Sequence, residues 1–351
     1  MSDQDKINKL IGESGYLVAD GATGTNLFAL GLESGQPPEL WNMEAPEKVA
    51  LNHRNFIKAG ASIILTNTFG ANHCRLKLHN LENQAKEINY KAACIAKDVA
   101  SEFKKEVLVA GSMGPTGELM YPLGKLTSED AKNYFYEQAK GLKDGDVDII
   151  WIETLSDAKE LECAILAAKK TNIPIICTYS FDTHGKSMMG LEPKDLAKLA
   201  ESYYPNVIGY GANCGTGTSE LIGTMICLAQ VKRNDDMHLI AKGNCGIPSL
   251  VNGNITYTET PAHMALYAKY AQEIGADIIG GCCGTRPEHI EAMSNTLKNN
   301  SKTKIDTEVI MKELGNMSKG NISLIEKYLY PERNKESLKK KSKRNRRRRN
   351  T

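Results

Sequence analysis

The chain has 351 residues, of which 41% are hydrophobic and 25% are charged, a composition typical of a soluble protein with a buried core. No apolar run approaches the roughly 20 residues that a membrane helix needs, and the first residues lack the pattern of a signal peptide. We therefore expect a cytoplasmic protein with no membrane partner. In that compartment, nine cysteines point to metal binding or catalysis rather than to a disulfide framework.

The formal net charge of +2 conceals an asymmetry between the body of the chain and its end. From Arg333 to Arg349 there are eleven Lys or Arg residues and one acidic residue, Glu336, so this segment carries +10. Because the total is +2, the rest of the chain carries −8. Such a concentration of like charge cannot bury itself, and it predicts a disordered basic tail over residues 332–351.

Short apolar segments alternate with longer amphipathic ones along the first 300 residues. The apolar segments predict eight strands, over 16–19, 62–66, 106–110, 148–152, 174–179, 206–210, 238–241 and 277–280. The amphipathic segments predict helices over 46–58, 83–103, 128–144, 158–170, 193–203, 219–232 and 260–273. Strands that are apolar on both faces, each followed by a helix, predict a parallel sheet, and eight such units favour an α/β fold of the (β/α)8 TIM barrel type.

An open, doubly wound parallel sheet is the alternative arrangement of the same units. The barrel is favoured because polar residues stand where the predicted strands stop, and a barrel gathers all those ends on the face that holds active sites. We expect the barrel to occupy residues 1–300. A helical extension over 301–331 should follow, with short helices at 308–314 and 322–329.

Cysteines follow three of the predicted strands. Cys282 and Cys283 stand together in a glycine-rich segment, and Cys214 and Cys245 each lie in an Asn-Cys-Gly sequence. Three thiolates match the soft ligands that zinc prefers, and they would leave one coordination position open. Spacing does not choose between Cys214 and Cys245, and a structural site with all four cysteines is an alternative. Adjacent cysteines can also be buried small hydrophobes or a vicinal disulfide.

Five motifs at the strand ends, taken together, resemble the homocysteine S-methyltransferase family. They are Asp20-Gly21-Ala22-Thr23-Gly24-Thr25, Thr66-Asn67-Thr68-Phe69, Glu153-Thr154, Asn213-Cys214-Gly215 and Gly280-Gly281-Cys282-Cys283-Gly284-Thr285. The resemblance covers roughly residues 10–297 and is strongest to bacterial betaine–homocysteine methyltransferases. It implies an enzyme that transfers a methyl group from an onium donor, with betaine favoured, to the thiolate of L-homocysteine, which forms methionine.

The resemblance also implies the roles of individual residues. Cys214, Cys282 and Cys283 would hold Zn²⁺, which leaves Cys245 outside the site. The positions that match homocysteine contacts are Asp20, Gly21, Thr25, Glu153 and Asn244. Consecutive backbone amides over 21–25 would form an anion nest for the substrate carboxylate.

An onium centre cannot take a conventional hydrogen bond, so proteins surround it with aromatic faces. Trp41 matches a donor-binding tryptophan of the betaine enzymes, with a packing role as its alternative, and Phe69, Tyr121 and Phe181 lie in other strand-end loops. Gly70 and Thr154 stand where animal betaine enzymes carry tyrosines. S-methylmethionine, dimethylsulfoniopropionate and other methyl donors therefore remain open.

A function of a different class is a barrel with structural zinc whose basic tail binds nucleic acid. The tail lacks aromatic residues for base stacking, so such binding would be independent of sequence. Zinc content together with thiol-dependent methyl transfer distinguishes the two functions. Oligomeric state stays open, with a homo-oligomer as one alternative, because helices after residue 300 can pack on their own barrel or on a neighbour's.

Overall fold

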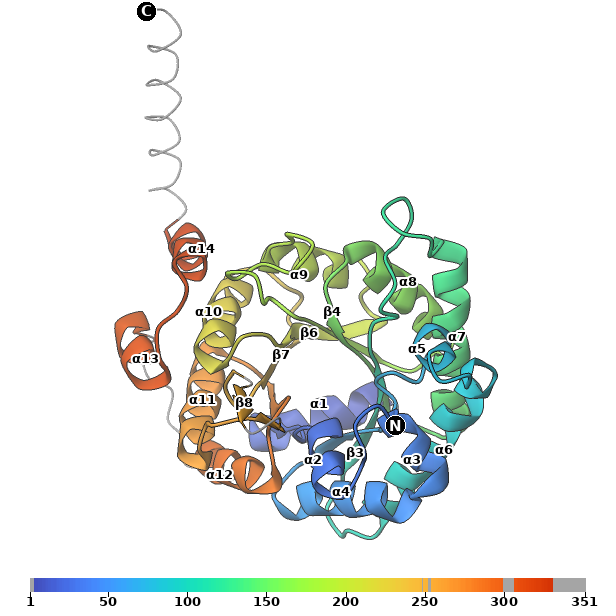
Figure 1. The fold of residues 1–351 in the computed structure, drawn as a ribbon. Coiled ribbons are helices and arrows are strands. Elements are labelled where there is room, and N and C mark those ends of the chain that lie inside the picture. The colour runs from blue at the N-terminus through green and yellow to red at the C-terminus, as the bar shows by residue number, and fades with distance from the viewer. Residues whose placement is uncertain (1–2, 248, 252–253, 299–305, 331–351) are drawn as a thin grey trace, which may run out of the picture.

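The computed structural model describes residues 3–247, 249–251, 254–298 and 306–330. Its main sheet has eight strands, in the order β1-β10-β7-β6-β5-β4-β3-β2. They are β1 (Leu17–Val18), β2 (Ile63–Leu65), β3 (Leu108–Met113), β4 (Ile149–Leu155), β5 (Ile175–Tyr179), β6 (Val207–Cys214), β7 (His238–Gly243) and β10 (Ile278–Gly281). All neighbouring strands are parallel, and a parallel bridge between Ala19 and Ile63 joins the two edges. The fold is therefore the predicted (β/α)8 barrel (Figure 1).

Helices form a ring around the strands (Figure 1). The helices among the described residues, both in this ring and outside it, are α1 (Asp3–Ser14), α2 (Gly24–Ala29), η1 (Pro38–Leu40), α3 (Trp41–Glu44), α4 (Pro46–Lys58), α5 (His73–Lys77), η2 (Glu82–Gln84), α6 (Ala85–Ser101), α7 (Ser128–Asp144), α8 (Ala158–Lys169), α9 (Pro193–Glu201), α10 (Thr218–Ala229), α11 (Pro261–Ile274), α12 (Pro287–Lys298), α13 (Thr307–Leu314) and α14 (Lys319–Leu329). Within the described part of the chain, no helix is both long and apolar enough to cross a membrane.

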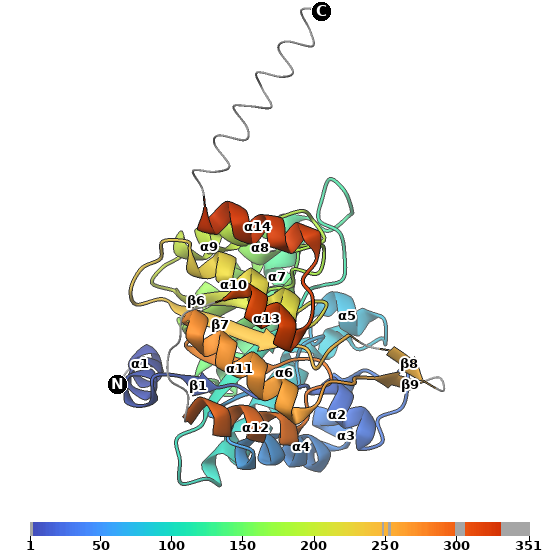
Figure 2. The ribbon, with the colours of Figure 1, turned by 90° about the vertical axis from the view of Figure 1, so that its left-hand side faces the viewer.

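The two ends of the barrel differ in character (Figure 2). At one end α1 lies across the barrel, and its Ile7 is buried in the same cluster as the inward-facing strand residues. At the other end a small antiparallel hairpin projects, formed by β8 (Ser249–Val251) and β9 (Asn254–Thr256), which the sequence did not predict. The helix closes the amino ends of the strands, so the carboxyl ends are left to form the site.

Three strands extend at least three residues beyond their predicted ends. The sequence predicts that they stop at residues 110, 152 and 210, whereas β3, β4 and β6 continue to Met113, Leu155 and Cys214. Their polar residues keep the ladder pairing, as when Ser112 pairs with Trp151 and Cys214 with Gly243. Backbone groups make these bonds, so strand ends need not be apolar. As a result, Ser112, Glu153 and Cys214 lie on strands rather than in loops.

The barrel interior changes from apolar to polar along its axis. The inward-facing apolar residues are Leu17, Ala19, Ile63, Leu65, Leu108, Ala110, Ile149, Trp151, Ile176, Ile208, Ile240 and Ile278. Two residues further along β4 and β7, the same face carries Glu153 and Lys242, both buried. The polar layer therefore rests on a packed apolar floor.

The helices after the barrel pack on its outside, against α10 and α11 (Figure 2). The Glu220 carboxylate of α10 accepts hydrogen bonds from Asn321 Nδ2 at 2.8 Å and from Ser318 Oγ at 3.2 Å. This contact holds α14 to the barrel of its own chain. The predicted basic tail over 332–351 lies outside the described residues.

Core packing between α7 and β3 gives a stability prediction. Leu142 is fully buried, and a Cβ at Gly111 would approach its Cδ1 to 2.8 Å. We expect Leu142→Ala to lower the free energy of unfolding by about 2–5 kcal/mol, because it leaves a cavity. Leu123→Ala is the control, since Leu123 is 70% exposed and should change stability by less than about 0.5 kcal/mol. Denaturant unfolding followed by circular dichroism measures both, and equal losses would contradict the packing.

Candidate active site

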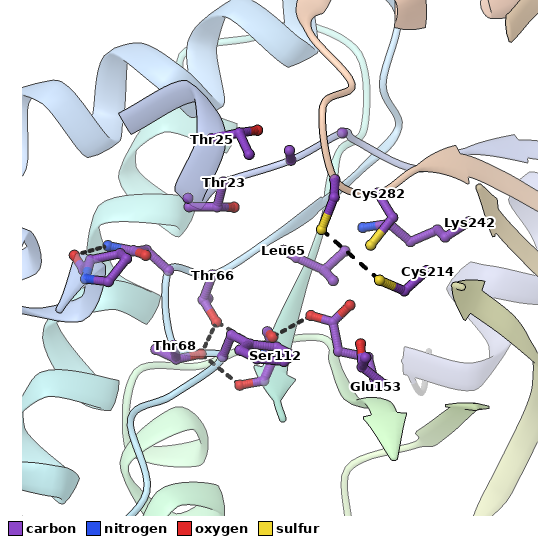
Figure 3. A pocket seen from close by; sticks show the side chains of 18 of the residues that line it. Thr23, Thr25, Leu65, Thr66, Thr68, Ser112, Glu153, Cys214, Lys242 and Cys282 are labelled. Carbon is purple, nitrogen blue, oxygen red and sulfur yellow. Dashed lines mark hydrogen bonds between the residues drawn. The ribbon is translucent and has the colours of Figure 1, made fainter. Parts of the chain in front are cut away.

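A pocket of about 290 Å³ opens at the carboxyl ends of the strands (Figure 3). Its wall includes the loop over residues 21–25 after β1 and the loop over residues 66–69 after β2. Strand ends supply the rest of the wall, which includes Ser112, Glu153, Cys214, Lys242 and Cys282. Residues from seven strands or from the loops that follow them, far apart in the sequence, therefore share one cavity.

Three cysteine thiols converge on this pocket. The sulfurs of Cys214, Cys282 and Cys283 all lie within 4.8 Å of one another, and no other group of this kind occurs among the residues that the structure describes. Cys214 Sγ is 4.0 Å from Cys283 Sγ although 69 positions separate them in the chain. Cys245 points elsewhere, because its thiol donates to the Glu259 carbonyl at 3.1 Å. The geometry thus brings together the three predicted ligands and leaves Cys245 outside.

The chain adopts unusual backbone conformations to present these groups. Cys214 and Thr154 both have positive φ, 62° and 64°, which side chains other than glycine rarely adopt. The Asn213 side chain holds this arrangement, since Nδ2 donates to Thr154 Oγ1 at 2.6 Å and Oδ1 accepts from the Thr154 amide at 2.9 Å. Backbone strain of this kind is concentrated at functional sites, and here it aims the Cys214 thiol at the pocket.

Asn244 ties the two cysteine-bearing loops together. Its Nδ2 donates to the Gly215 carbonyl at 2.7 Å, and its Oδ1 accepts from the Cys283 amide at 3.1 Å. Asn244 is 3% exposed and does not line the pocket. The structure therefore places it where it positions the thiols, and direct contact with homocysteine stays a prediction.

The environment of the thiols favours a cation. The neighbouring Cys214 thiol, together with burial, raises the pKa of Cys282 well above its ordinary value. Thiols with such pKa values stay protonated at neutral pH, whereas coordination to a divalent cation displaces their protons. Three soft donors that share one small volume are a ligand set for a thiophilic metal.

The acidic residues predicted for substrate binding have different surroundings. Asp20 is 1% exposed, accepts from the Leu65 amide at 2.8 Å and from Lys242 Nζ at 3.1 Å, and does not line the pocket. Glu153 lines the pocket and accepts from Ser112 Oγ at 2.5 Å. Burial raises the pKa of both carboxyl groups, and the nearby Lys242 charge opposes this rise. Of the two, Glu153 is the carboxylate that a ligand can reach.

Lys242 is a site residue that the sequence analysis missed. It lines the pocket, is 2% exposed, and lies with its Nζ 5.5 Å from the centroid of the Trp151 ring. The sequence does contain a signal for it: Lys242 stands two positions after Ile240 in an apolar strand, so the two side chains face the same side of the sheet, the barrel interior. A lysine in such a position is expensive to bury without a partner.

The loop after β1 offers both backbone and side-chain donors. The first amides of α2, which begins at Gly24, have no acceptor inside the helix. Thr25 Oγ1 is buried and has no hydrogen-bond partner in the part of the chain that the structure describes. Residues 21–25 all line the pocket, and a nest for a carboxylate at this loop stays a prediction.

The predicted aromatic residues are only partly brought together. Phe69 lines the pocket, and so does Phe28, which the sequence analysis did not select. Trp41 is 7% exposed in a separate cluster with Leu27, Leu32 and Val49, which agrees with its packing alternative. It does not line the pocket.

The other two aromatic candidates also lie away from the pocket wall. Tyr121 is 62% exposed in the loop before α7. Phe181 packs against Tyr179, with ring centroids 5.9 Å apart. Phe28 and Phe69 are therefore the aromatic residues of the pocket wall.

A (β/α)8 barrel that carries three thiols beside a pocket at its carboxyl face defines a class of candidate metal-dependent enzymes. Residues 17–297 match the family model described as homocysteine S-methyltransferase, and the chain belongs to this family.

Two curated relatives are methionine synthases. The chain is 30% identical to the protein of Mycobacterium tuberculosis over 301 residues and to that of Mycobacterium leprae over 298 residues. These matches cover 81% and 79% of this chain but 25% and 24% of the relatives. The chain thus spans about a quarter of the length of these relatives.

Solved structures of the homocysteine methyltransferase MmuM from Escherichia coli share the fold. The oxidised form has a TM-score of 0.69 at 24% identity and covers 82% of this chain and 98% of its own. The metallated form has a TM-score of 0.69 at 23% identity, with coverages of 82% and 99%.

The Asn244 bridge gives a prediction about metal affinity. Asn244→Ala removes both hydrogen bonds between the cysteine loops, and loss of such an outer contact typically weakens metal binding by about 10- to 100-fold. Competition with a chromophoric chelator measures this affinity for Zn²⁺. Asn83→Ala, at an exposed position, should leave it unchanged. Equal affinities for wild type and Asn244→Ala would show that the bridge does not organise the thiols.

Proposed function

We propose that the protein is a zinc-dependent homocysteine S-methyltransferase that moves a methyl group from an onium donor to the thiolate of L-homocysteine, which forms methionine. The observation that carries the proposal is the convergence of three thiols on the pocket, in a chain that belongs to this family. A metallated form of MmuM, itself a homocysteine methyltransferase, adds support for a resident metal.

The thiols fit zinc in number, type and spacing. Tetrahedral zinc holds sulfur at about 2.3 Å, which places two ligand sulfurs about 3.8 Å apart. The Cys214 and Cys283 sulfurs are 4.0 Å apart. Three protein ligands would leave the fourth coordination position for a substrate atom. Zinc held by the three cysteines would supply the positive charge that keeps the homocysteine sulfur deprotonated at neutral pH.

The remaining contacts orient homocysteine. Glu153, the carboxylate that lines the pocket, is placed to receive the substrate ammonium. The amides of Gly21 and of residues 23–25 would receive its carboxylate together with the unpartnered Thr25 hydroxyl, whereas the Ala22 amide already donates to the Thr285 carbonyl at 3.1 Å. Asp20 and Asn244 support the site from behind the wall, since both lie within networks of hydrogen bonds.

Methyl transfer then needs no general base in the protein. The homocysteine sulfur attacks the methyl carbon in line with the departing heteroatom, a new S–C bond forms, and the donor leaves with the electron pair of the broken bond. Phe28 and Phe69 supply aromatic faces for the cationic donor. Betaine is the favoured donor, and S-methylmethionine and dimethylsulfoniopropionate are the alternatives. Direct contacts from Trp41 and Tyr121 would require that loops rearrange when the donor binds.

Removal of one thiol tests the metal site. Cys282→Ala should lose zinc and methyl transfer while the barrel still folds, because Cys282 follows the end of β10 and does not belong to the strand core. Cys245→Ala is the matched control and should keep both, since Cys245 bonds to the Glu259 carbonyl outside the cluster. Elemental analysis measures zinc, mass spectrometry measures methionine, and circular dichroism measures folding. A Cys282→Ala protein with full zinc content and activity would refute the site.

A donor screen tests the reaction. Homocysteine is incubated with the zinc-loaded protein and betaine, S-methylmethionine, dimethylsulfoniopropionate or methylcobalamin, and methionine is measured by mass spectrometry. We expect methionine from at least one onium donor, with betaine the most effective, and none with Cys282→Ala. If methylcobalamin were the only donor that gave methionine, the proposal of an onium donor would be wrong.

A further inference from the structure

Lys242 is a charged group inside the barrel for which the proposed reaction has no role. It belongs to β7, where it pairs with Asn213 of β6 and Gly280 of β10, so its side chain starts beside the strands that carry the cysteines. Figure 3 shows the side chain extending toward Cys282 at the edge of the pocket. It is therefore both a buried residue and part of the pocket wall.

The surroundings of Lys242 keep it charged. Burial alone would lower the pKa of its ammonium, but the nearby carboxylates of Asp20 and Glu153 act in the opposite direction, and the pKa of Lys242 is raised. An ammonium carries three donors. Asp20 Oδ1, at 3.1 Å, is the one hydrogen-bond acceptor of Nζ among the described residues. Two donors are thus left for a ligand at the pocket wall.

Asp20 fixes the direction of this ammonium. The second oxygen of the carboxylate, Oδ2, accepts from the Leu65 amide at 2.8 Å, so Asp20 cannot turn away without the loss of a buried hydrogen bond. A carboxylate held in this way anchors one side of the Lys242 ammonium. The rest of the ammonium lies at the pocket wall, on the side of Cys282 (Figure 3).

We propose that Lys242 is a substrate-binding residue whose ammonium, anchored by Asp20, faces the sulfur of bound homocysteine beside Cys282 and stabilises it as a thiolate. This inference rests on the proposed function. Asp20 then acts on the substrate through Lys242 as a positioning residue, and Glu153 is the carboxylate for the substrate ammonium. The family resemblance implies direct contact between Asp20 and homocysteine, whereas this inference gives Asp20 an indirect role.

Electrostatics explain the need for such a charge. Three cysteine thiolates would carry more negative charge than one Zn²⁺ offsets, and the homocysteine thiolate would add a fourth negative charge at the same site. Repulsion between like charges is strong at short range in a low-dielectric interior. A fixed ammonium beside the incoming sulfur offsets this repulsion, because it is present before the substrate arrives.

The test uses binding without turnover. Isothermal titration measures the affinity of the zinc-loaded protein for L-homocysteine in the absence of methyl donor. Lys242→Met, neutral and similar in length, should lose at least tenfold in affinity, whereas Lys242→Arg should stay within about threefold of wild type. Zinc content is measured on the same samples and should not change. An unchanged homocysteine affinity in Lys242→Met overturns the inference.

A double variant separates this role from a structural ion pair. Lys242→Met alone leaves Asp20 buried without its cation, and Asp20→Asn/Lys242→Met removes that defect. The double variant should regain the unfolding midpoint but not the homocysteine affinity. Recovery of both would show that the pair serves only the fold.

A second ligand separates contact with sulfur from contact with the carboxylate. The compound 3-aminopropane-1-thiol keeps the thiol and ammonium of homocysteine and lacks its carboxylate. Lys242→Met should weaken both ligands by a similar factor, and a loss confined to homocysteine would overturn the inference. Failure of the wild-type zinc protein to bind homocysteine would instead refute the proposed function.

Discussion

The Asp20 carboxylate joins the seam at which the barrel closes to the chemistry at its mouth. At this seam β1 has only two residues, and few ladder bonds connect it to β2. Asp20 adds to them, because its amide donates to the Ile63 carbonyl at 2.9 Å and its side chain accepts from the Leu65 amide at 2.8 Å. The same side chain pairs with Lys242 across the interior. Closure of the barrel and placement of a positive charge at the pocket thus depend on one residue.

The apolar floor of the barrel determines the direction in which the buried charged groups face. Trp151 and its neighbours fill the barrel below Glu153 and Lys242, so charged groups there face the pocket from one side only. A buried charge without a partner is costly, and each member of this layer has one: Ser112 for Glu153, and Asp20 for Lys242. Because the groups are held before a ligand arrives, little free energy is spent on ordering them when it binds.

The strand pattern of the sequence predicted the barrel, and the cysteine pattern predicted a thiol cluster at the strand ends, whereas the choice of Cys214 over Cys245 came from the family resemblance. Eight apolar strand segments that alternate with helices favour a barrel, and in a barrel the strands that are followed by cysteines meet at one face. Other features depend on side-chain direction, which such patterns do not define. Trp41 turns into a cluster with Leu27, and Asp20 turns to Lys242, so neither lines the pocket. Phe28 does so because α2 carries it there.

The charge balance of the proposed reaction explains the combination of a negative centre with an apolar wall. A thiolate and an onium ion become a thioether and a neutral leaving group, so opposite charges disappear as the methyl group moves. Water stabilises separated ions more than the transition state in which they cancel, and an apolar wall that includes Phe28 and Phe69 removes that stabilisation. The surplus negative charge of the thiolates and Glu153 draws the cation in. The Lys242 ammonium offsets part of this negative charge at the homocysteine sulfur, the atom that attacks the methyl group.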